Sequence, residues 1–181
     1  ANAVYRKSDS LVVKSLSASS ILQESKHIVR LFDHVLEKSD FHIGTMNPET
    51  FSACKQNLGS DFLFKAYYLE EVLVGFSTAF KNAASFDANY VGLDYAYNAQ
   101  FDIYQRILYD YVEEAIDAQV PELQFGRTSE LIKSAVGAEP RDMTIYIKHK
   151  RKLSNVILKK VIQSVSPSPF ELRKPFKANF K

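Results

Sequence analysis

The feature that most constrains the fold of this chain is an amphipathic segment from Phe101 to Gln119. Its apolar residues recur at intervals of three and four: Phe101, Tyr104, Ile107, Leu108, Tyr111, Val112, Ala115 and Ile116. Its polar residues fall on the opposite side: Asp102, Gln105, Arg106, Asp110, Glu113, Glu114 and Asp117. This period is that of an α-helix with one buried face. The helix needs an apolar surface to cover, and the strand-like runs before it predict a sheet.

Six runs are rich enough in β-branched and aromatic residues, or alternate clearly enough, to predict strands. They are residues 11–16, 62–69, 72–80, 90–97, 123–126 and 143–149. Glu70 and Glu71 separate the second run from the third, which predicts a hairpin. Within the run 90–97, Asp94 stands mid-strand, where an acid is unusual.

Helices are predicted between these runs. Apolar spacing predicts a helix over 21–38, and the serines at 17–20 are candidate N-caps. Asn47 followed by Pro48, with Gly59 at the end, marks a second helix over 47–58, in which Cys54 is expected to be a core residue. A short helix is predicted over 129–136, closed by Gly137.

The order of these elements predicts an α+β fold with a mixed, mostly antiparallel sheet flanked by helices and one strand-helix-strand crossover. We expect one domain over residues 4–152, with residues 1–3 read as a cloning remnant. Residues 153–181 are expected to form a basic helix over 153–165 and an extended tail. This C-terminal part is expected to pack on the domain or on a missing N-terminal half.

The composition limits the class of protein. With 181 residues, of which 46% are hydrophobic and 24% charged, the chain can form one ordinary core. No apolar run reaches the roughly 18 residues that span a bilayer. The single cysteine cannot form an internal disulfide, and no secretory signal is recognised, so we expect a reducing, cytoplasmic compartment.

The net charge of +2 hides an asymmetry between the two ends of the chain. From Lys148 onward there are ten basic residues and one acidic residue, a net charge of +9. The rest of the chain carries 13 basic and 20 acidic residues, a net charge of −7. Such a basic end suits a polyanion, an anionic lipid surface, the acidic body itself or a missing domain.

The sequence lacks the motifs of several common binding and catalytic chemistries. The four histidines are dispersed and no second cysteine is present, so no metal site is expected. The six glycines never cluster into a phosphate-binding loop or a dinucleotide fingerprint, and a Gly-x-Ser-x-Gly elbow is missing.

The block from residue 90 to residue 149 resembles a known family. Its quoted segments are Tyr90-Val91-Gly92-Leu93-Asp94-Tyr95, then Tyr104 with Leu108-Tyr109-Asp110, then Phe125-Gly126-Arg127-Thr128, Ile132-Lys133-Ser134 and Gly137-Ala138, with the tail Pro169-Phe170-Glu171-Leu172-Arg173-Lys174-Pro175-Phe176. These segments resemble GNAT-fold acyltransferases of the FemAB/FemX and BioF2-like branch. The resemblance implies a GNAT-like fold, transfer of an acyl or aminoacyl group to an amine, and a place as the second of two such domains.

The resemblance also implies an acyl donor, but one loop of this chain departs from the donor-binding motif of the family. Acetyl-CoA-using members carry a glycine-containing diphosphate loop before the helix, where this chain has residues 97–102, Tyr-Asn-Ala-Gln-Phe-Asp. Without glycines, and with Asp102 present, this loop is degenerate for acetyl-CoA or another acyl-CoA. Aminoacyl-tRNA, the donor of characterised FemX-like members, is the other candidate.

Six residues are candidates for the site. Lys133 and Arg127 are cations suited to an oxyanion or a phosphate, although both could instead pair with the acidic helix face. Asp94 is a candidate base or ligand of the substrate amine, or a hydrogen-bonded structural acid. Tyr95, Tyr97 and Tyr104 are candidate substrate-binding residues, or core. Two alternatives to an enzyme remain open. Under these alternatives the chain is either a non-catalytic GNAT-like binding domain or a nucleic-acid binder that uses the basic tail.

Overall fold

The structure is a computed structural model that describes residues 1–38, 47–126, 129–144, 146–151, 154–155, 157–158 and 171–176. Two compact units make up the chain, residues 1–127 and residues 128–181. The first contains the sheet and most of the helices, and each unit is described by itself. The expected boundary between residues 152 and 153 stays a prediction.

A hairpin organises the sheet of the first unit. Strands β2 (Phe62–Leu69) and β3 (Val72–Lys81) pair antiparallel, as the sequence predicts, and Glu70 turns the chain with a positive φ of 56°. β1 (Leu11–Ser15) pairs antiparallel with β2, and β4 (Phe86–Leu93) pairs antiparallel with β3. β5 (Leu123–Gln124) joins β4 in parallel at two residue pairs. The strand order is β1-β2-β3-β4-β5, which confirms the mixed, mostly antiparallel sheet.

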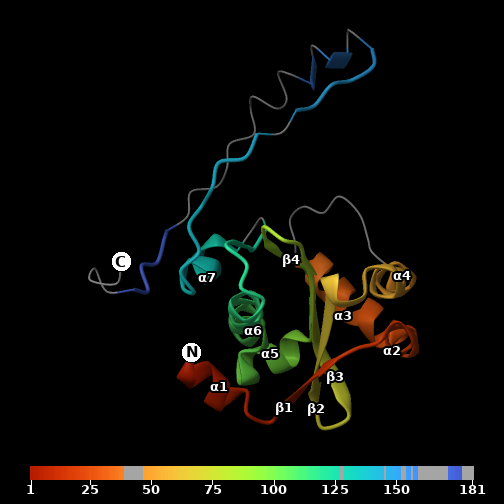
Figure 1. Cartoon of the computed structure of the whole chain (residues 1–181), viewed down its shortest axis with the longest axis vertical. Helices are drawn as coiled ribbons and strands as arrows, with labels where there is room; N and C mark the ends of the chain where they lie inside the picture. The colour runs from red at the N-terminus through yellow and green to blue at the C-terminus, as the bar shows by residue number, and fades with distance from the viewer. Residues whose placement is uncertain are drawn as a thin grey trace. The chain divides into compact units, whose positions relative to one another are not determined.

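Three helices, α2, α3 and α4, cover one face of this sheet (Figure 1). α2 (Ala18–Gln23) is capped by the Ser17 hydroxyl, and α3 (Ser25–Glu37) follows after Glu24, so the helix predicted over 21–38 is two helices. α4 (Pro48–Leu58) begins at Asn47, whose side chain accepts the Thr50 N–H, and runs into a short 3-10 turn, Gly59–Asp61. These are the predicted caps, because a side-chain oxygen at the N-cap satisfies an amide that has no partner within the helix.

Aromatic rings dominate the core between this helical layer and the sheet. Phe51 and Phe76 are fully buried, and their ring centroids lie 5.9 Å apart. The cluster consists of Leu16, Ile21, Ile28, Leu31, Phe32, Phe51, Phe62, Phe64, Ala66, Tyr68, Leu73 and Phe76. Cys54 is half-buried against it, in agreement with its expected core position.

The other face of the sheet is covered by α1 (Asn2–Lys7), α5 (Tyr95–Phe101) and α6 (Ile103–Asp117) (Figure 1). α6 is the predicted amphipathic helix, but its buried stripe is turned from the expected one. Asp110, predicted to face solvent, is 4% exposed, whereas Ile116, predicted to be buried, is 68% exposed. At 100° per residue Asp110 borders the stripe of Ile103 and Ile107, and Ile116 falls outside it.

Two predicted strands differ in the structure. The run 90–97 is a strand only to Leu93, because α5 begins at Tyr95. In the run 143–149, the described residues 143–144 and 146–149 form no strand, and Tyr146 is 93% exposed. The aromatic and β-branched content that predicted these strands does not by itself supply a hydrogen-bonding partner.

The second unit contains α7 (Glu130–Ser134) and a returning C-terminal segment. The Arg173 N–H donates to the Ser134 hydroxyl at 3.0 Å. Gly137 lies so close to the Phe176 ring that a Cβ at this position would come within 2.3 Å of it. Of the helix predicted over 153–165, residues 154–155 and 157–158 are described and are helical, and the others lie outside the described residues.

Candidate functional site

The carboxyl end of β4 is the candidate site in the first unit. β4 and β5 pair only at Phe86–Leu123 and Asp87–Gln124, after which β4 continues for six residues to Leu93. Within the described residues, no strand borders that stretch of β4 on the β5 side. Ligands of sheets with parallel strands and crossover helices bind beyond the carboxyl ends of the strands. The first residue beyond β4 is Asp94.

Asp94 joins strand and helix rather than standing in mid-strand. Its N–H donates to the Val74 carbonyl at 2.9 Å, and its Oδ1 accepts the Ala96 N–H at 3.1 Å, which caps α5. Its other oxygen, Oδ2, lies 3.7 Å from the guanidinium of Arg30 on α3. Asp94 is buried while Arg30 is half-exposed, so the pair presents one buried anion and one accessible cation.

Two candidate tyrosines share this turn with Asp94. Tyr95 and Tyr97 lie in the first turn of α5 and are half-buried. Burial raises the pKa of Tyr95. The ammonium of Lys38 lies 3.8 Å from the centroid of the Tyr95 ring, and the Tyr97 ring lies 6.5 Å from that of Phe101. The structure therefore brings Asp94, Tyr95 and Tyr97 together.

Arg30 and Lys38 belong to this cluster and were missed by the sequence reasoning. They lie eight residues apart on or just after α3, with the half-buried His34 midway between them. Residues four apart lie on the same side of a helix, so the spacing 30-34-38 was a usable signal. The missing information was that α3 packs on β4 and that Arg30 and Lys38 reach the Asp94–Tyr95 turn at its end.

The end of α6 that follows α5 does not fit the diphosphate of an acyl-CoA. The Asn98 side chain accepts the Tyr104 N–H at 2.8 Å, so it occupies a donor that an anion would need. Asp102 precedes the helix with a φ of 49°, and its carboxylate adds negative charge while pairing with Lys7 at 2.9 Å. Tyr104 is half-buried in the first turn of α6, on the helix that follows α5.

The remaining two candidates lie apart from this cluster in the sequence. Arg127 lies outside the described residues. Lys133 belongs to the second unit, on α7, and is 9% exposed. Burial lowers its pKa to about 8, while the nearby Glu130 carboxylate acts in the opposite direction. An ammonium with this pKa is half deprotonated at about pH 8, where ordinary lysines are protonated.

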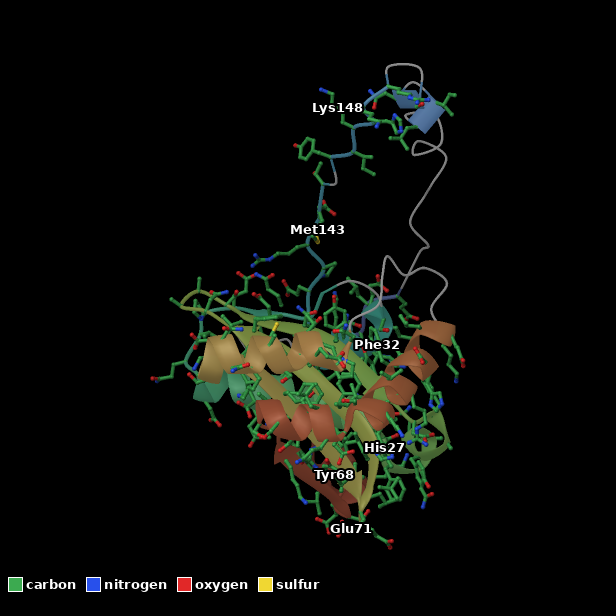
Figure 2. All side chains as sticks on the ribbon, turned by 90° about the vertical axis from the view of Figure 1, so that its right-hand side faces the viewer. His27, Phe32, Tyr68, Glu71, Met143 and Lys148 are labelled. Carbon is green, nitrogen blue, oxygen red and sulfur yellow. The ribbon has the colours of Figure 1, made fainter. Side chains whose placement is uncertain are left out.

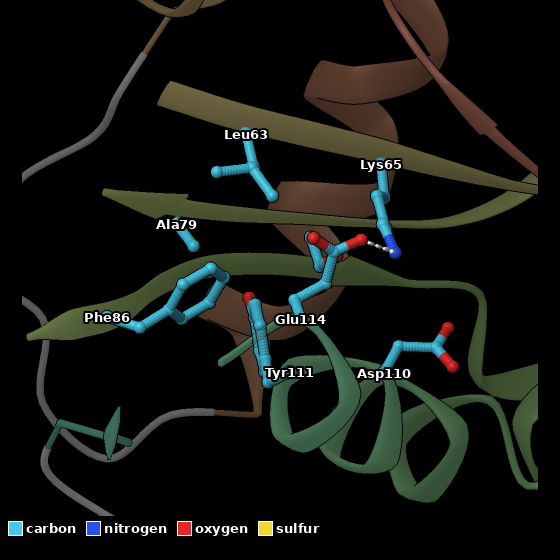
Figure 3. A pocket seen from close by; sticks show the side chains of 8 residues that line it. Leu63, Lys65, Ala79, Phe86, Asp110, Tyr111 and Glu114 are labelled. Carbon is cyan, nitrogen blue, oxygen red and sulfur yellow. Dashed lines mark ion pairs between the residues drawn. The ribbon is translucent and has the colours of Figure 1, made fainter. Parts of the chain in front are cut away.

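A small pocket lies between the sheet and α6 (Figure 3). Its volume of about 10 Å³ is that of one water-sized sphere, too small for a substrate. The ion pair of Lys65 and Glu114 lies beside it. Asp110 also lines it and accepts the Tyr67 hydroxyl at 2.9 Å and the Arg106 Nε–H at 2.8 Å.

Comparisons with known proteins give a fold but no family. No family model matches the chain, and no curated protein matches it. Solved structures do match. The aminoglycoside acetyltransferase meta-AAC0020 from an uncultured soil metagenomic sample, in complex with sisomicin, is 17% identical with a TM-score of 0.57, over 78% of this chain and 98% of that one.

Two further acetyltransferases match over a similar share of their length. Glucosamine-6-phosphate N-acetyltransferase from Arabidopsis thaliana is 8% identical with a TM-score of 0.58, over 78% of this chain and 99% of that one. Ribosomal-protein-alanine N-acetyltransferase from Brucella melitensis biovar Abortus 2308 is 9% identical with a TM-score of 0.54, over 77% and 99%. The chain has the fold of GNAT acetyltransferases, as the resemblance implied.

In the described part of the chain, no helix combines the length and the apolar character needed to cross a bilayer. The same residues contain no group of three or more histidine, cysteine or acidic side chains placed to hold a metal ion.

Proposed function

We propose that this chain is a transferase that moves an acyl or aminoacyl group onto an amine, and that it is the C-terminal half of a two-domain FemX- or BioF2-like protein of the cytoplasm. One observation carries the proposal: a buried carboxylate, Asp94, stands at the carboxyl end of β4 in a GNAT fold. Acyl transfer needs a group that binds the attacking amine and accepts its proton.

Asp94 is suited to that role by its two unequal oxygens. Oδ1 is used by the cap of α5, whereas Oδ2 faces Arg30 at 3.7 Å, beyond hydrogen-bond distance. An ammonium or amine placed at Oδ2 is held by charge. Tyr95 and Tyr97, on the same turn, supply ring surface and hydroxyls for the acceptor, and Tyr104 on α6 is proposed as a further acceptor-binding residue.

Lys133 and Arg127 are the proposed cations for the oxyanion or for a phosphate of the donor. With a pKa near 8, Lys133 is mostly protonated at pH 7 and can stabilise negative charge there. Acyl-CoA is the donor that the fold implies, yet the start of α6 does not accommodate its diphosphate, so we derive no step through it. Aminoacyl-tRNA, which suits the basic C-terminal end, is the donor we favour.

The experiment compares donors and variants of the full chain. Binding of acetyl-CoA, CoA and aminoacyl-tRNA is measured by calorimetry, and loss of the thioester or aminoacyl ester is followed with a panel of primary amines. Asp94→Asn retains an N-cap of equal quality but loses the charge, so it should slow transfer at least tenfold at unchanged stability. Asp94→Ala loses both the cap and the charge, so its difference from Asp94→Asn measures the contribution of the cap.

The alternative function is a non-catalytic GNAT-like binding domain. The start of α6 favours it, because Asn98 and Asp102 close the place where a diphosphate would lie. If no donor is bound or consumed, the transferase proposal fails and the binding domain stands. Binding of tRNA that weakens steeply with salt, without turnover, instead supports the nucleic-acid binder.

A further inference from the structure

Arg30 extends from a firmly packed stretch of α3. This helix can be followed in Figure 2 from the labelled His27 to the labelled Phe32, and Arg30 lies between them in the sequence. Its side chain is 45% exposed, whereas Ile28 and Leu31 on the same helix are buried in the core. Because these neighbours fix the helix, the guanidinium is presented from a rigid element, as a binding residue needs to be.

The guanidinium of Arg30 uses only part of its hydrogen-bonding capacity inside the protein. In the described part of the chain both of its polar contacts involve Nη2, which donates to the Leu73 carbonyl at 3.4 Å and lies 3.7 Å from Asp94 Oδ2. A guanidinium carries five N–H donors in one plane, and three of them belong to Nε and Nη1. Arg30 can therefore stay beside Asp94 and bind a carboxylate of a ligand at the same time.

The short distance between Arg30 and Asp94 limits the spacing of charges in a ligand. The side chain of Asp94 is 12% exposed against 45% for Arg30, so the anion lies deeper than the cation. A ligand amine at Asp94 Oδ2 and a ligand anion at the guanidinium must themselves lie close together, because the two protein groups are 3.7 Å apart. In an α-amino acid a single carbon atom joins the amine and the carboxylate, which gives this short spacing.

Lys38 adds a second cation to the same site. Its side chain is exposed, and its ammonium lies 3.8 Å from the centroid of the Tyr95 ring, on the residue after Asp94. The site thus combines one buried carboxylate with two accessible cations. A ligand that carries only an ammonium group is repelled by both cations, whereas an amino acid has no net charge and meets a partner for each of its groups.

We propose that the amine acceptor of this site is an α-amino acid, whose amine lies at Asp94 Oδ2 and whose carboxylate binds Arg30. This inference rests on the proposed transfer to an amine and narrows its substrate class. The rings of Tyr95 and Tyr97, on the turn that follows Asp94, offer an aromatic surface to the side chain of the amino acid. Arg30 then determines specificity, because it touches the carboxylate and not the amine that reacts.

The transfer step is balanced with an aminoacyl ester as the donor. The amine nitrogen forms an amide bond to the acyl carbon, and the bond from that carbon to the ester oxygen breaks. The oxygen leaves with the bonding electron pair and takes up one of the two protons that the original ammonium loses. The other proton passes to Asp94 and then to water.

Calorimetric binding to the full chain, without a donor, tests the proposal. Three probes share one ring and differ in their charged groups: L-phenylalanine has both, 2-phenylethylamine has only the amine, and 3-phenylpropanoate has only the carboxylate. We expect L-phenylalanine to bind at least about tenfold more tightly than either of the others. Equal binding of L-phenylalanine and 2-phenylethylamine, or no binding of L-phenylalanine, overturns the proposal.

Variants of α3 assign this preference to Arg30. Arg30→Gln should weaken L-phenylalanine at least about tenfold and leave 2-phenylethylamine bound as well as before or better, because the removed cation meets only the carboxylate. Lys26→Gln is the matched control: it removes an exposed positive charge one turn earlier on α3 and should change neither affinity. Thermal unfolding checks that both variants are folded. A folded Arg30→Gln variant that binds L-phenylalanine like the wild type contradicts the proposal.

Turnover separates this inference from the transferase proposal. With aminoacyl-tRNA as the donor, L-phenylalanine and 2-phenylethylamine are compared by kcat/KM. Transfer to both at equal kcat/KM would support the transferase and overturn the amino-acid acceptor. Preferential binding of L-phenylalanine without any consumption of donor would overturn the transferase and support a site that binds amino acids.

Discussion

Lys133 is the residue at which burial and charge conflict most directly. It is 9% exposed, and its pKa is lowered to about 8. A folded chain that holds an ammonium there at neutral pH loses stability relative to one with an apolar side chain. Residues retained at such a cost are frequent at functional sites, which is why Lys133 remains in the proposed machinery.

The lowered pKa of Lys133 predicts how stability depends on pH. Between pH 8 and 10 the unfolded chain keeps the lysine proton that the folded chain has released, so the contribution of Lys133 to the free energy of unfolding should rise with pH. This contribution should rise by ~2 kcal/mol across the window. Buried tyrosines oppose it as the pH approaches 10, because burial raises their pKa values, to about 12 for Tyr5 and Tyr68, and the unfolded chain then releases phenol protons that the folded chain keeps.

Urea unfolding of the wild type and of Lys133→Met, repeated across the window, checks this prediction. Lys133→Met should be more stable than the wild type at pH 7. Its free energy of unfolding should lack the rise that Lys133 contributes in the wild type. Equal slopes in the two proteins would mean that Lys133 titrates normally.

Asp110 is another buried charge, 4% exposed, and its carboxylate lies in a network of hydrogen-bond donors. Its carboxylate accepts from Arg106, Tyr67 and, at 3.4 Å, Tyr5. Asp110→Ala leaves the largely buried Arg106 without its anion and should lower the free energy of unfolding by about 3 kcal/mol. Glu113→Ala, an exposed neighbour, should change it by less than ~0.5 kcal/mol.

The double variant Arg106→Met with Asp110→Leu tests whether the loss comes from the uncompensated charge. It should recover most of the stability, because apolar residues of similar size replace buried ion pairs well. If Asp110→Ala and the double variant are equally destabilised in urea unfolding, the packing rather than the charge is responsible.

At the scale of helices and strands, the sequence correctly predicted the caps, turns and helices that local residue chemistry determines. The Asn47 cap with Pro48, the hairpin across Glu70 and the long helix α6 follow from residues close together in the chain. α5 was missed because Tyr95 and Tyr97 favour strands, whereas Asp94 at its N-cap favours a helix.

The candidate site was predictable in part for the same reason. Asp94, Tyr95 and Tyr97 are neighbours in sequence and remain together in the structure. Arg30 reaches Asp94 across 64 positions of chain through the packing of α3 on β4, which no local pattern encodes.

Gly92 on β4 shows how closely the sheet packs. It pairs with Phe76 of β3, and a Cβ at Gly92 would lie 2.1 Å from the Phe76 ring. That ring is fully buried and contacts Phe51 and Phe64, so it cannot turn away. Gly92→Ala should therefore cost about 2 kcal/mol of unfolding free energy through overpacking.

A second substitution identifies the cause of that loss. Phe76→Leu removes the obstructing ring edge, so adding Gly92→Ala to Phe76→Leu should cost clearly less than adding it to the wild type. Chemical denaturation of the four proteins measures this coupling. Simple additivity would show that the backbone at Gly92, and not the ring, resists the methyl group.

At the scale of the whole molecule, the first unit contains everything that a folding domain needs. All five strands, both helical layers and the aromatic cluster lie within residues 1–127. α1 adds to this unit: the Lys7 ammonium bonds the Ala99 carbonyl and Asp102, and Tyr5 reaches the Asp110 network. The second unit contributes α7 and its returning segment, which are held together by Ser134 and Gly137.

This division predicts that a chain of residues 1–127 folds without the rest. Its far-ultraviolet circular dichroism should retain the mixed helix and strand signal, and urea should unfold it in one cooperative transition, because no element of its sheet or core is removed. A matched chain of residues 1–152, which ends at the boundary expected from sequence, should be no more stable by the same measurement. A shorter chain that unfolds without cooperativity, beside a cooperative longer one, would show instead that α7 and the residues after it complete the core.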